Sequence, residues 1–168
     1  MSKRIGSVPY LNAVPLTRSD EDRDIFPLSF AQQRIWFLDQ LDPGQPTYNI
    51  AFAGVFDGQV DVGRLEAALG AVVERHSTLR SVVDLDDTGA ASIRVLEFDR
   101  EMCLVSTVPA PDADSANQVA LANATAPFDL TTGPLIRVVV AQTSTRDVVS
   151  ICVHHFCFDG WSMPIFMR

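Results

Sequence analysis

Cysteine is scarce in this chain, and its three copies lack the spacing of a disulfide framework or a zinc site. Cys103 stands alone, while Cys152 and Cys157 lie in or beside an apolar segment, where a free thiol behaves as a small hydrophobic group. This use of cysteine suits a reducing compartment. We therefore expect a cytoplasmic protein.

The sequence also has no apolar run near the roughly 20 residues that a membrane-spanning helix needs. Lys3 and Arg4 supply positive charge near the start, but Pro9, Asn12 and Pro15 interrupt the segment that follows. A secretory signal requires a continuous apolar stretch after its positive charges. We expect neither a signal peptide nor a contact with the membrane.

Basic residues are in the minority, with 13 Lys and Arg against 21 Asp and Glu, which gives a net charge of −8. This balance argues against nonspecific binding to nucleic acid and to anionic membranes. No serine lies in a Gly-x-Ser-x-Gly elbow, and no glycine-rich phosphate loop is present. The sequence therefore gives no support to an elbow-type serine hydrolase or a nucleotide-binding protein.

The 168 residues are 47% hydrophobic and 20% charged, a composition typical of a globular domain or a large piece of one. Ser29 and Gln32 have the spacing of a capping box at the start of a first helix, and Asp61 is placed to cap a second. We expect a third helix over residues 115–126. The expected strands cover residues 48–57, 79–85, 93–98, 135–141 and 148–155, with hairpin turns at 86–89 and 143–147. The pattern indicates an α/β fold, an α+β two-layer sandwich with a mixed, largely antiparallel sheet and flanking helices.

The most informative stretch is Val153 to Ser162, VHHFCFDGWS, which closes a strongly apolar run. Neighbouring strand residues point to opposite faces, so only one of His154 and His155 can face a given cavity. Gly160 suggests a tight turn in which a side chain would clash. Ser162 is placed to cap a helix that begins at Met163 or Pro164.

An imidazole here suits proton transfer, because its ordinary pKa of about 6.5 lies near working pH. Asp159, four residues after His155, could orient an imidazole or neutralise a buried guanidinium. A metal site is disfavoured because His154 and His155 diverge, and His76 has no helpful spacing. Cys157 is a poor nucleophile between two phenylalanines, since apolar neighbours raise the pKa of a thiol.

The order His-His-x-x-x-Asp-Gly resembles the signature of the condensation domains of nonribosomal peptide synthetases, which share the chloramphenicol acetyltransferase-like fold. Four other stretches resemble motifs of the same family in the expected order. They are LSFAQQRIWFL at 28–38, YNI at 48–50, RHSTLRS at 75–81 and FDLTTGPLIR at 128–137. Ser77 and Ser81 depart from the usual Glu and Thr of the third motif. The details FLDQL, YNI and DGWS are similar to domains that accept an L-configured donor.

The resemblance implies that residues 25–168 form the N-terminal lobe of such a domain, cut just after the His-His motif, and that 1–24 are a flexible or edge-packed leader. It implies amide formation between a donor thioester and an acceptor aminoacyl thioester. His155 would be catalytic, with His154, Asp159, Gly160, Trp161 and Ser162 in support. Arg80 is the first candidate to pair with Asp159, and Arg34 the second.

No cofactor is expected to bind directly, because the substrates would be carried on the phosphopantetheine of partner proteins. The implied partners are the donor and acceptor carrier proteins and the missing C-terminal lobe. The lone lobe is expected to be inactive and, through its exposed apolar surface, prone to self-association.

Alternative functions remain open at this point. One is a coenzyme A-dependent acyltransferase on the same fold, and another is a module that docks a carrier protein without catalysis. Residues 3–16, KRIGSVPYLNAVPL, resemble the opening of menaquinone-pathway enzymes with a periplasmic-binding-like fold. That likeness suggests a third possibility, a fusion or an enzyme of that kind.

Overall fold

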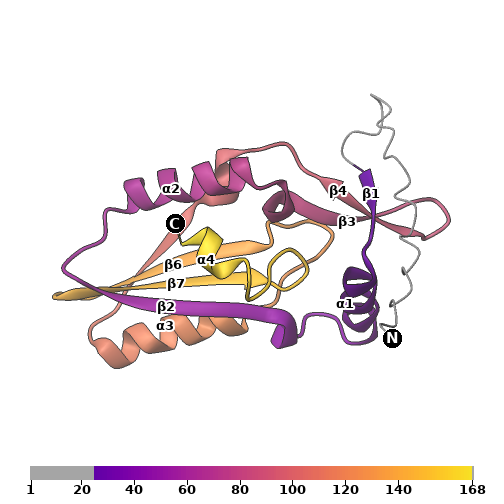
Figure 1. The fold of residues 1–168 in the computed structure, drawn as a ribbon. Helices are drawn as coiled ribbons and strands as arrows, with labels where there is room; N and C mark the ends of the chain where they lie inside the picture. Colours follow the sequence, from indigo (N-terminus) through magenta and orange to yellow (C-terminus); the bar gives the residue numbers. More distant parts are fainter. Residues whose placement is uncertain (1–24, 168) are drawn as a thin grey trace, which may run out of the picture.

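A computed structural model describes residues 25–167, and Figure 1 shows the arrangement of its elements. The leader proposed for residues 1–24 lies outside the described residues. In order, the elements are β1 (Ile25–Pro27), α1 (Phe30–Leu41), β2 (Asn49–Asp57), α2 (Val62–Arg75), β3 (Ser81–Leu85), β4 (Ala91–Val95), β5 (Val105–Pro109), α3 (Ala113–Thr125), β6 (Ile136–Gln142), β7 (Arg146–His154) and α4 (Met163–Phe166). Three short 3-10 turns, η1 (Pro46–Tyr48), η2 (Ser77–Arg80) and η3 (Arg100–Cys103), connect them.

The main sheet has the strand order β2-β7-β6-β5. The β2–β7 and β6–β7 pairs are antiparallel, and β5 joins β6 in parallel. The hairpin expected at residues 143–147 is present, with Ala141 paired to Val148 and Gln142 to Asp147, and its turn is shorter because β7 begins at Arg146. The α/β class with a mixed, largely antiparallel sheet and flanking helices is confirmed.

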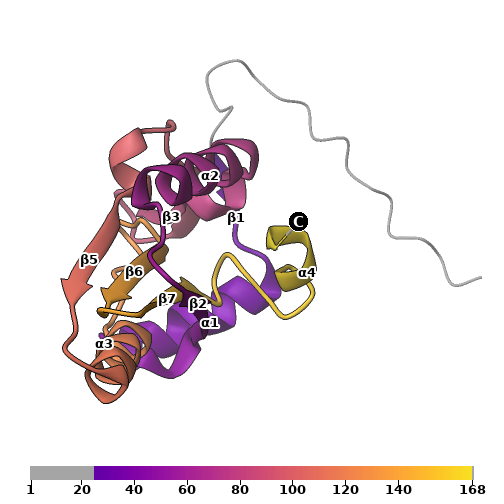
Figure 2. The same cartoon turned by 90° about the vertical axis from the view of Figure 1, so that its left-hand side faces the viewer.

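A helix covers each face of this sheet, as Figure 2 shows with α2 and α3 on opposite sides of the strands. Alternate residues of β6 and β7 therefore meet different helices. Val138, Val140 and Val149 pack with Leu69 and Val73 of α2. On the other face, Ala141 and Val148 pack with Ala116 of α3. Helices thus lie on both sides of the sheet, where a two-layer arrangement would have placed them on one.

The second sheet has the order β1-β4-β3 and pairs with α1 through a separate core. Its β3–β4 hairpin is the one expected around residues 86–89, with Leu85 opposite Ala91. Gly89 has φ +82°, a left-handed conformation that glycine adopts without strain. Both β1 and β5 were absent from the sequence expectation, because each is short and takes its partner from a distant segment.

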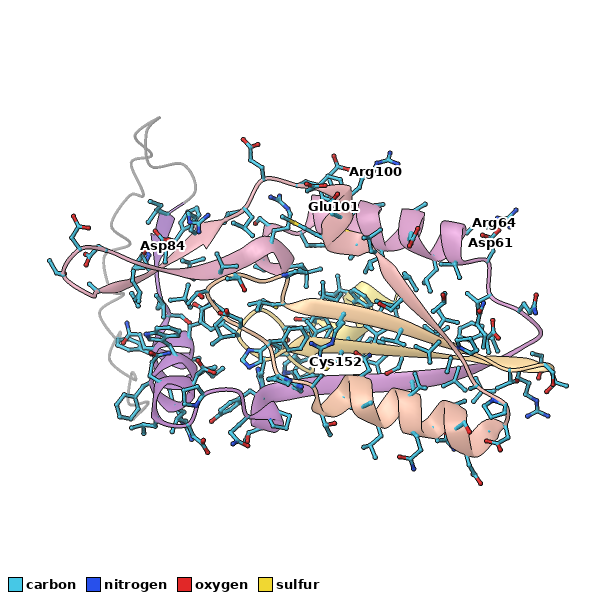
Figure 3. All side chains as sticks on the ribbon, turned by 180° about the vertical axis from the view of Figure 1, so that it is seen from behind. Asp61, Arg64, Asp84, Arg100, Glu101 and Cys152 are labelled. Atoms are coloured by element: carbon cyan, nitrogen blue, oxygen red, sulfur yellow. The ribbon has the colours of Figure 1, made fainter. Side chains whose placement is uncertain are left out.

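Local signals at helix starts are confirmed. The Ser29 hydroxyl accepts a hydrogen bond from the Gln32 amide, and the Gln32 side chain accepts one from the Ser29 amide. Asp61 likewise accepts from the Arg64 amide at the start of α2. Figure 3 shows Asp61 and Arg64 together at that end of the helix. Within residues 25–167, every helix is too short or too polar to cross a bilayer.

Candidate functional site

Two adjacent imidazoles differ completely in their surroundings at the end of β7. His154 is the last residue of the strand and is only 4% exposed, whereas His155 begins the following turn and is exposed. The expectation that the two rings diverge is therefore confirmed. Only His155 is open to a reacting molecule.

Backbone hydrogen bonds fix the turn that presents His155. Its amide donates to the Tyr48 carbonyl at 2.8 Å, and the His154 amide donates to the Leu135 carbonyl at 2.9 Å. The Cys157 amide then closes the turn onto the His154 carbonyl at 3.1 Å. Two other segments of the chain and one bond within the turn thus hold the backbone on either side of the exposed ring.

The buried ring of His154 is held in one tautomer. Its Nδ1 accepts a hydrogen bond from the Phe156 amide at 3.2 Å, so the proton of the neutral ring is on Nε2. Burial, with a smaller contribution from the neighbouring His155, lowers the pKa of His154 to about 4. His154 is therefore a neutral structural group at physiological pH.

Asp159 forms hydrogen bonds within the next turn and is not held in the expected ion pair. Its Oδ1 accepts hydrogen bonds from the Ser162 amide at 2.9 Å and from the Ser162 hydroxyl at 2.7 Å. These bonds from Ser162 lower the pKa of the Asp159 carboxyl. Ser162 directly precedes α4, as expected, but its side chain makes no capping bond to the helix. Asp159 thus closes the turn that leads into α4, while Ser162 occupies the N-cap position without a side-chain bond.

The expected pairing of Arg80 with Asp159 is wrong. The Nε of Arg80 donates to the Val73 carbonyl at 3.1 Å, and its terminal nitrogens donate to the carbonyls of Glu74 and Leu96. The carbonyls of Val73 and Glu74 belong to the last turn of α2, where a cation is also favoured by the helix dipole, and the Leu96 carbonyl directly follows β4. Arg34, the second candidate, is exposed on α1, and no ion pair joins it to Asp159 among the described residues.

Gly160, Trp161 and Cys157 complete this stretch, and the expected crowding at Gly160 is not found. Gly160 is free of the predicted clash: a side chain there would meet nothing within 4 Å, and its φ is not positive. Trp161 is 87% exposed, an unusual state for so large an apolar side chain beside a candidate site. Burial raises the pKa of the Cys157 thiol to about 12, which agrees with the expectation that its apolar neighbours disfavour a thiolate.

The sequence analysis did not predict which aromatic side chains pack against the buried His154 ring. The Phe128 and Tyr48 rings meet the His154 ring edge-on, with centroids 5.9 and 6.3 Å away. Arg137 stacks on Phe128 and donates to Asn123 Oδ1 and to the carbonyls of Asn123, Ala126 and Pro127. The motif at residues 128–137 contained this signal, since it holds both Phe128 and Arg137.

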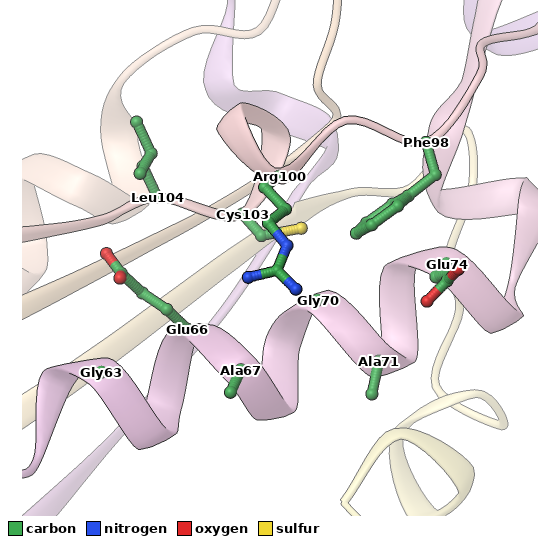
Figure 4. A pocket seen from close by; sticks show the side chains of 10 residues that line it. All are labelled: Gly63, Glu66, Ala67, Gly70, Ala71, Glu74, Phe98, Arg100, Cys103 and Leu104. Carbon is green, nitrogen blue, oxygen red and sulfur yellow. The ribbon is translucent and has the colours of Figure 1, made fainter.

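A second hollow lies away from this turn, between α2 and η3, with a volume of about 400 Å³. Figure 4 shows Arg100 reaching over Gly70 of α2, with Phe98 and Leu104 at the two ends. It contains none of the residues that the sequence singled out as a site. The His155 turn therefore remains the candidate site.

Comparison with known proteins agrees with this geometry. The family model for the condensation domain matches residues 22–168. A linear gramicidin synthase of Brevibacillus parabrevis is 39% identical over 163 residues, and phosphinothricin tripeptide synthetase PhsC of Streptomyces viridochromogenes is 36% identical over 162. The matches cover 94% and 93% of this chain, but only 2% and 14% of those two relatives.

Solved structures show the same arrangement of elements. The starter condensation domain of rhizomide synthetase RzmA is 26% identical with a TM-score of 0.73, over 86% of this chain and 35% of that one. The X-domain from teicoplanin biosynthesis is 28% identical with a TM-score of 0.74, over 91% of this chain and 32% of that one. The chain thus spans about a third of these solved chains. It belongs to the condensation-domain family of nonribosomal peptide synthetases.

Proposed function

We propose that this chain contributes His155 and its supporting turn to a condensation domain that forms an amide bond. The donor is an acyl or peptidyl thioester and the acceptor an aminoacyl thioester, both carried on the phosphopantetheine arms of carrier proteins. The observation that carries the proposal is the exposed His155 ring, on a turn fixed by Tyr48 and Leu135 and beside a buried, neutral His154.

The reaction needs one proton acceptor close to the attacking amine. The amine nitrogen attacks the donor carbonyl, the new C–N bond forms, the C–S bond breaks and the donor thiol leaves. His155 accepts or orients the proton that the amine gives up, and its N–H steadies the oxyanion of the tetrahedral intermediate. His154 acts through geometry alone, since its Nδ1 is already occupied by the Phe156 amide.

The remaining residues of the stretch have supporting roles in this proposal. Asp159 and Ser162 hold the backbone that follows His155, and Gly160 leaves open space beside it. Trp161, exposed and apolar, offers contact area to a substrate arm or to a second lobe of the domain. The sequence details at residues 37–41, 48–50 and 159–162 support an L-configured donor.

The test is an assay with two loaded carrier proteins and an intact condensation domain that contains this chain. His155→Ala should slow amide formation by about 100-fold or more, the usual contribution of general acid–base catalysis. The free energy of unfolding should stay within about 0.5 kcal/mol, because the ring is exposed. Arg64→Ala, which removes an exposed side chain of α2, should leave the rate unchanged.

Three results would contradict the proposal. Equal rates for wild type and His155→Ala would remove the catalytic role of this ring. Carrier binding without amide formation would indicate a docking module. Rapid transfer from free coenzyme A thioesters, with no need for a carrier protein, would indicate a coenzyme A-dependent acyltransferase.

A further inference from the structure

A small apolar pocket lies between α4 and the C-terminal end of α2, with a volume of about 140 Å³. Its walls come from α2 and η2 on one side and from the segment after His155 on the other. The lining residues are Val72, His76, Thr78, Leu79, Cys157, Phe158, Ser162, Ile165 and Phe166. Most of these residues are apolar and none is Asp, Glu, Lys or Arg, whereas His76, Thr78 and Ser162 add polar atoms to the wall, so the pocket suits a mainly apolar group.

The pocket shares its wall with the turn that presents His155. Cys157 lines the pocket, and its amide is bonded to the His154 carbonyl in that same turn. The Cα atoms of His155 and Cys157 can be at most about 7.6 Å apart, because consecutive Cα atoms are 3.80 Å apart. Cys157 thus places one wall of the pocket in the same turn that carries the exposed His155.

Aromatic contacts make part of this wall rigid. The Phe166 ring meets the Phe158 ring edge-on at a centroid distance of 5.8 Å, and the Phe52 ring at 6.1 Å. The Cys157 thiol stays protonated, because burial raises its pKa to about 12, and it lies near the carbonyls of Leu135 and His154. A thioester close to this wall therefore meets no competing thiolate.

The volume limits what can enter. Apolar cavities of about 150 Å³ take up a molecule of the size of benzene, whereas pockets for whole ligands measure about 300 to 1,000 Å³. A space of about 140 Å³ is thus suited to one branched aliphatic or aromatic side chain. It is too small for a complete substrate with its carrier arm.

We infer that this pocket receives the apolar side chain of an aminoacyl thioester while the thioester carbonyl lies at His155. The inference rests on the proposed function, since it names the class of substrate that the same site prefers. Val72 of α2 and Ile165 of α4 both line the pocket, so substitutions at these two positions test its specificity. The side chain could belong to the donor or to the acceptor, and the two sources can be separated by experiment.

Binding can be measured without turnover. The 168-residue chain, labelled with ¹³C at methyl groups, is titrated with the N-acetylcysteamine thioesters of N-acetyl-leucine and N-acetyl-glycine. The leucyl compound should shift the methyl signals of Val72, Leu79 and Ile165, and the glycyl compound should not. Ile165→Phe, at a residue that is 62% exposed, should abolish the shifts without affecting folding, and Val72→Phe should act likewise.

Leu121→Phe is the matched control, because Leu121 is 56% exposed and belongs to α3, on the other face of the sheet. It should leave the leucyl-induced shifts intact. An absence of shifts with the leucyl compound, or equal shifts in wild type and Ile165→Phe, would overturn the inference. This binding experiment tests the pocket whether or not the chain takes part in amide formation.

The kinetic arm uses the intact domain and identifies the substrate concerned. The ratio of kcat/KM for leucyl over glycyl substrates is measured once with the donor varied and once with the acceptor varied. Ile165→Phe should lower this ratio at least about tenfold for one of the two, the scale expected for one apolar group in a pocket. Unchanged ratios in both series would overturn the inference while the amide-forming function stood. A complete lack of amide product would contradict the proposed function. The methyl-shift titration would then show by itself whether the pocket binds an apolar side chain.

Discussion

The guanidinium carbon of Arg137 lies 4.2 Å from the centre of the Phe128 ring, and the Phe128 ring in turn meets the His154 ring edge-on. The same guanidinium donates to Asn123 Oδ1 at 3.0 Å and to the Ala126 carbonyl at 2.8 Å. One side chain of β6 thus joins the end of α3 to the aromatic support of the histidine turn. The motif at residues 128–137 therefore has a structural meaning: it ties a helix end to the base of the candidate site.

Arg137→Ala should destabilise the chain by about 2 to 3 kcal/mol, because it leaves several partly buried oxygens without a donor. Arg137→Lys should recover only part of the loss, since one ammonium cannot reproduce the planar fork or its stacking on Phe128. Urea unfolding curves measure both. Arg64→Ala is the control: its ion pair with Asp61 is exposed and should contribute less than about 0.5 kcal/mol. Equal effects at the two arginines would show that the network around Arg137 does not stabilise the fold.

His154 should make stability depend on pH in the range from about 6.5 to about 4. Its pKa is lowered in the folded chain, so the unfolded chain binds more protons in this range and stability falls as the pH falls. The loss should be on the order of 2 to 3 kcal/mol between these limits. His154→Asn retains an acceptor for the Phe156 amide and should flatten the profile.

Four hydrogen-bonded aspartates titrate below this range, and Asp39, whose pKa is raised by burial, is present in both proteins and cancels in their difference. Hydrogen bonds lower the pKa values of Asp86, Asp112, Asp129 and Asp159 below the ordinary 3.8, so their contributions are present above about pH 3.8 and are lost below it. Subtracting the His154→Asn profile from the wild-type profile isolates the histidine. A wild-type profile that is already flat from pH 6.5 to 4 would show that the ring is not buried as a neutral group.

Arg80 and Asp159 should behave as independent residues. Arg80→Ala removes donors from the carbonyls of Val73 and Leu96 and should destabilise the chain by about 1 to 3 kcal/mol. Asp159→Ala removes the acceptor for Ser162 and should have a smaller effect, because the carboxyl is open to solvent. In a double-mutant cycle, measured by urea unfolding, the two effects should simply add. A strong coupling between the two variants would restore the ion pair expected from the sequence.

The contrast between Ser29 and Arg80 shows which features a sequence can reveal. The capping box of Ser29 and Gln32, the Asp61 cap and the two hairpins depend on residues a few positions apart, so their patterns are legible in the sequence alone. Arg80 bonds to backbone carbonyls, which carry no residue-specific signal, and the family resemblance from which its pairing with Asp159 was expected does not show these bonds. The strand β5 could not be predicted either, because its parallel partner β6 begins 27 residues after β5 ends at Pro109.

At the candidate site, the strand-and-turn pattern was enough to separate His154 from His155, because the alternation of side chains in a strand is a local rule. It was not enough to predict the hydrogen bonds of Ser162, which was expected to cap the helix after it. In the structure Asp159 Oδ1 accepts two bonds from Ser162, and the Ser162 side chain makes none to α4. Only the three-dimensional path of the turn contains that information.

Asp147 is fully buried where β7 begins, close to the start of α2. Its Oδ2 accepts a hydrogen bond from the Val60 amide at 2.8 Å, while its Oδ1 has no partner among the described residues. A buried carboxylate oxygen without a donor costs free energy, whereas the occupied oxygen holds the segment that leads into α2. Asp147→Asn keeps an acceptor for Val60 and removes the buried charge, so it should leave stability within about 1 kcal/mol of wild type or raise it. Asp147→Leu leaves the Val60 amide unsatisfied and should destabilise the chain by about 1 to 3 kcal/mol, as measured by urea unfolding. If the asparagine variant were as unstable as the leucine variant, the negative charge itself, and not the single bond to Val60, would be what this end of α2 requires.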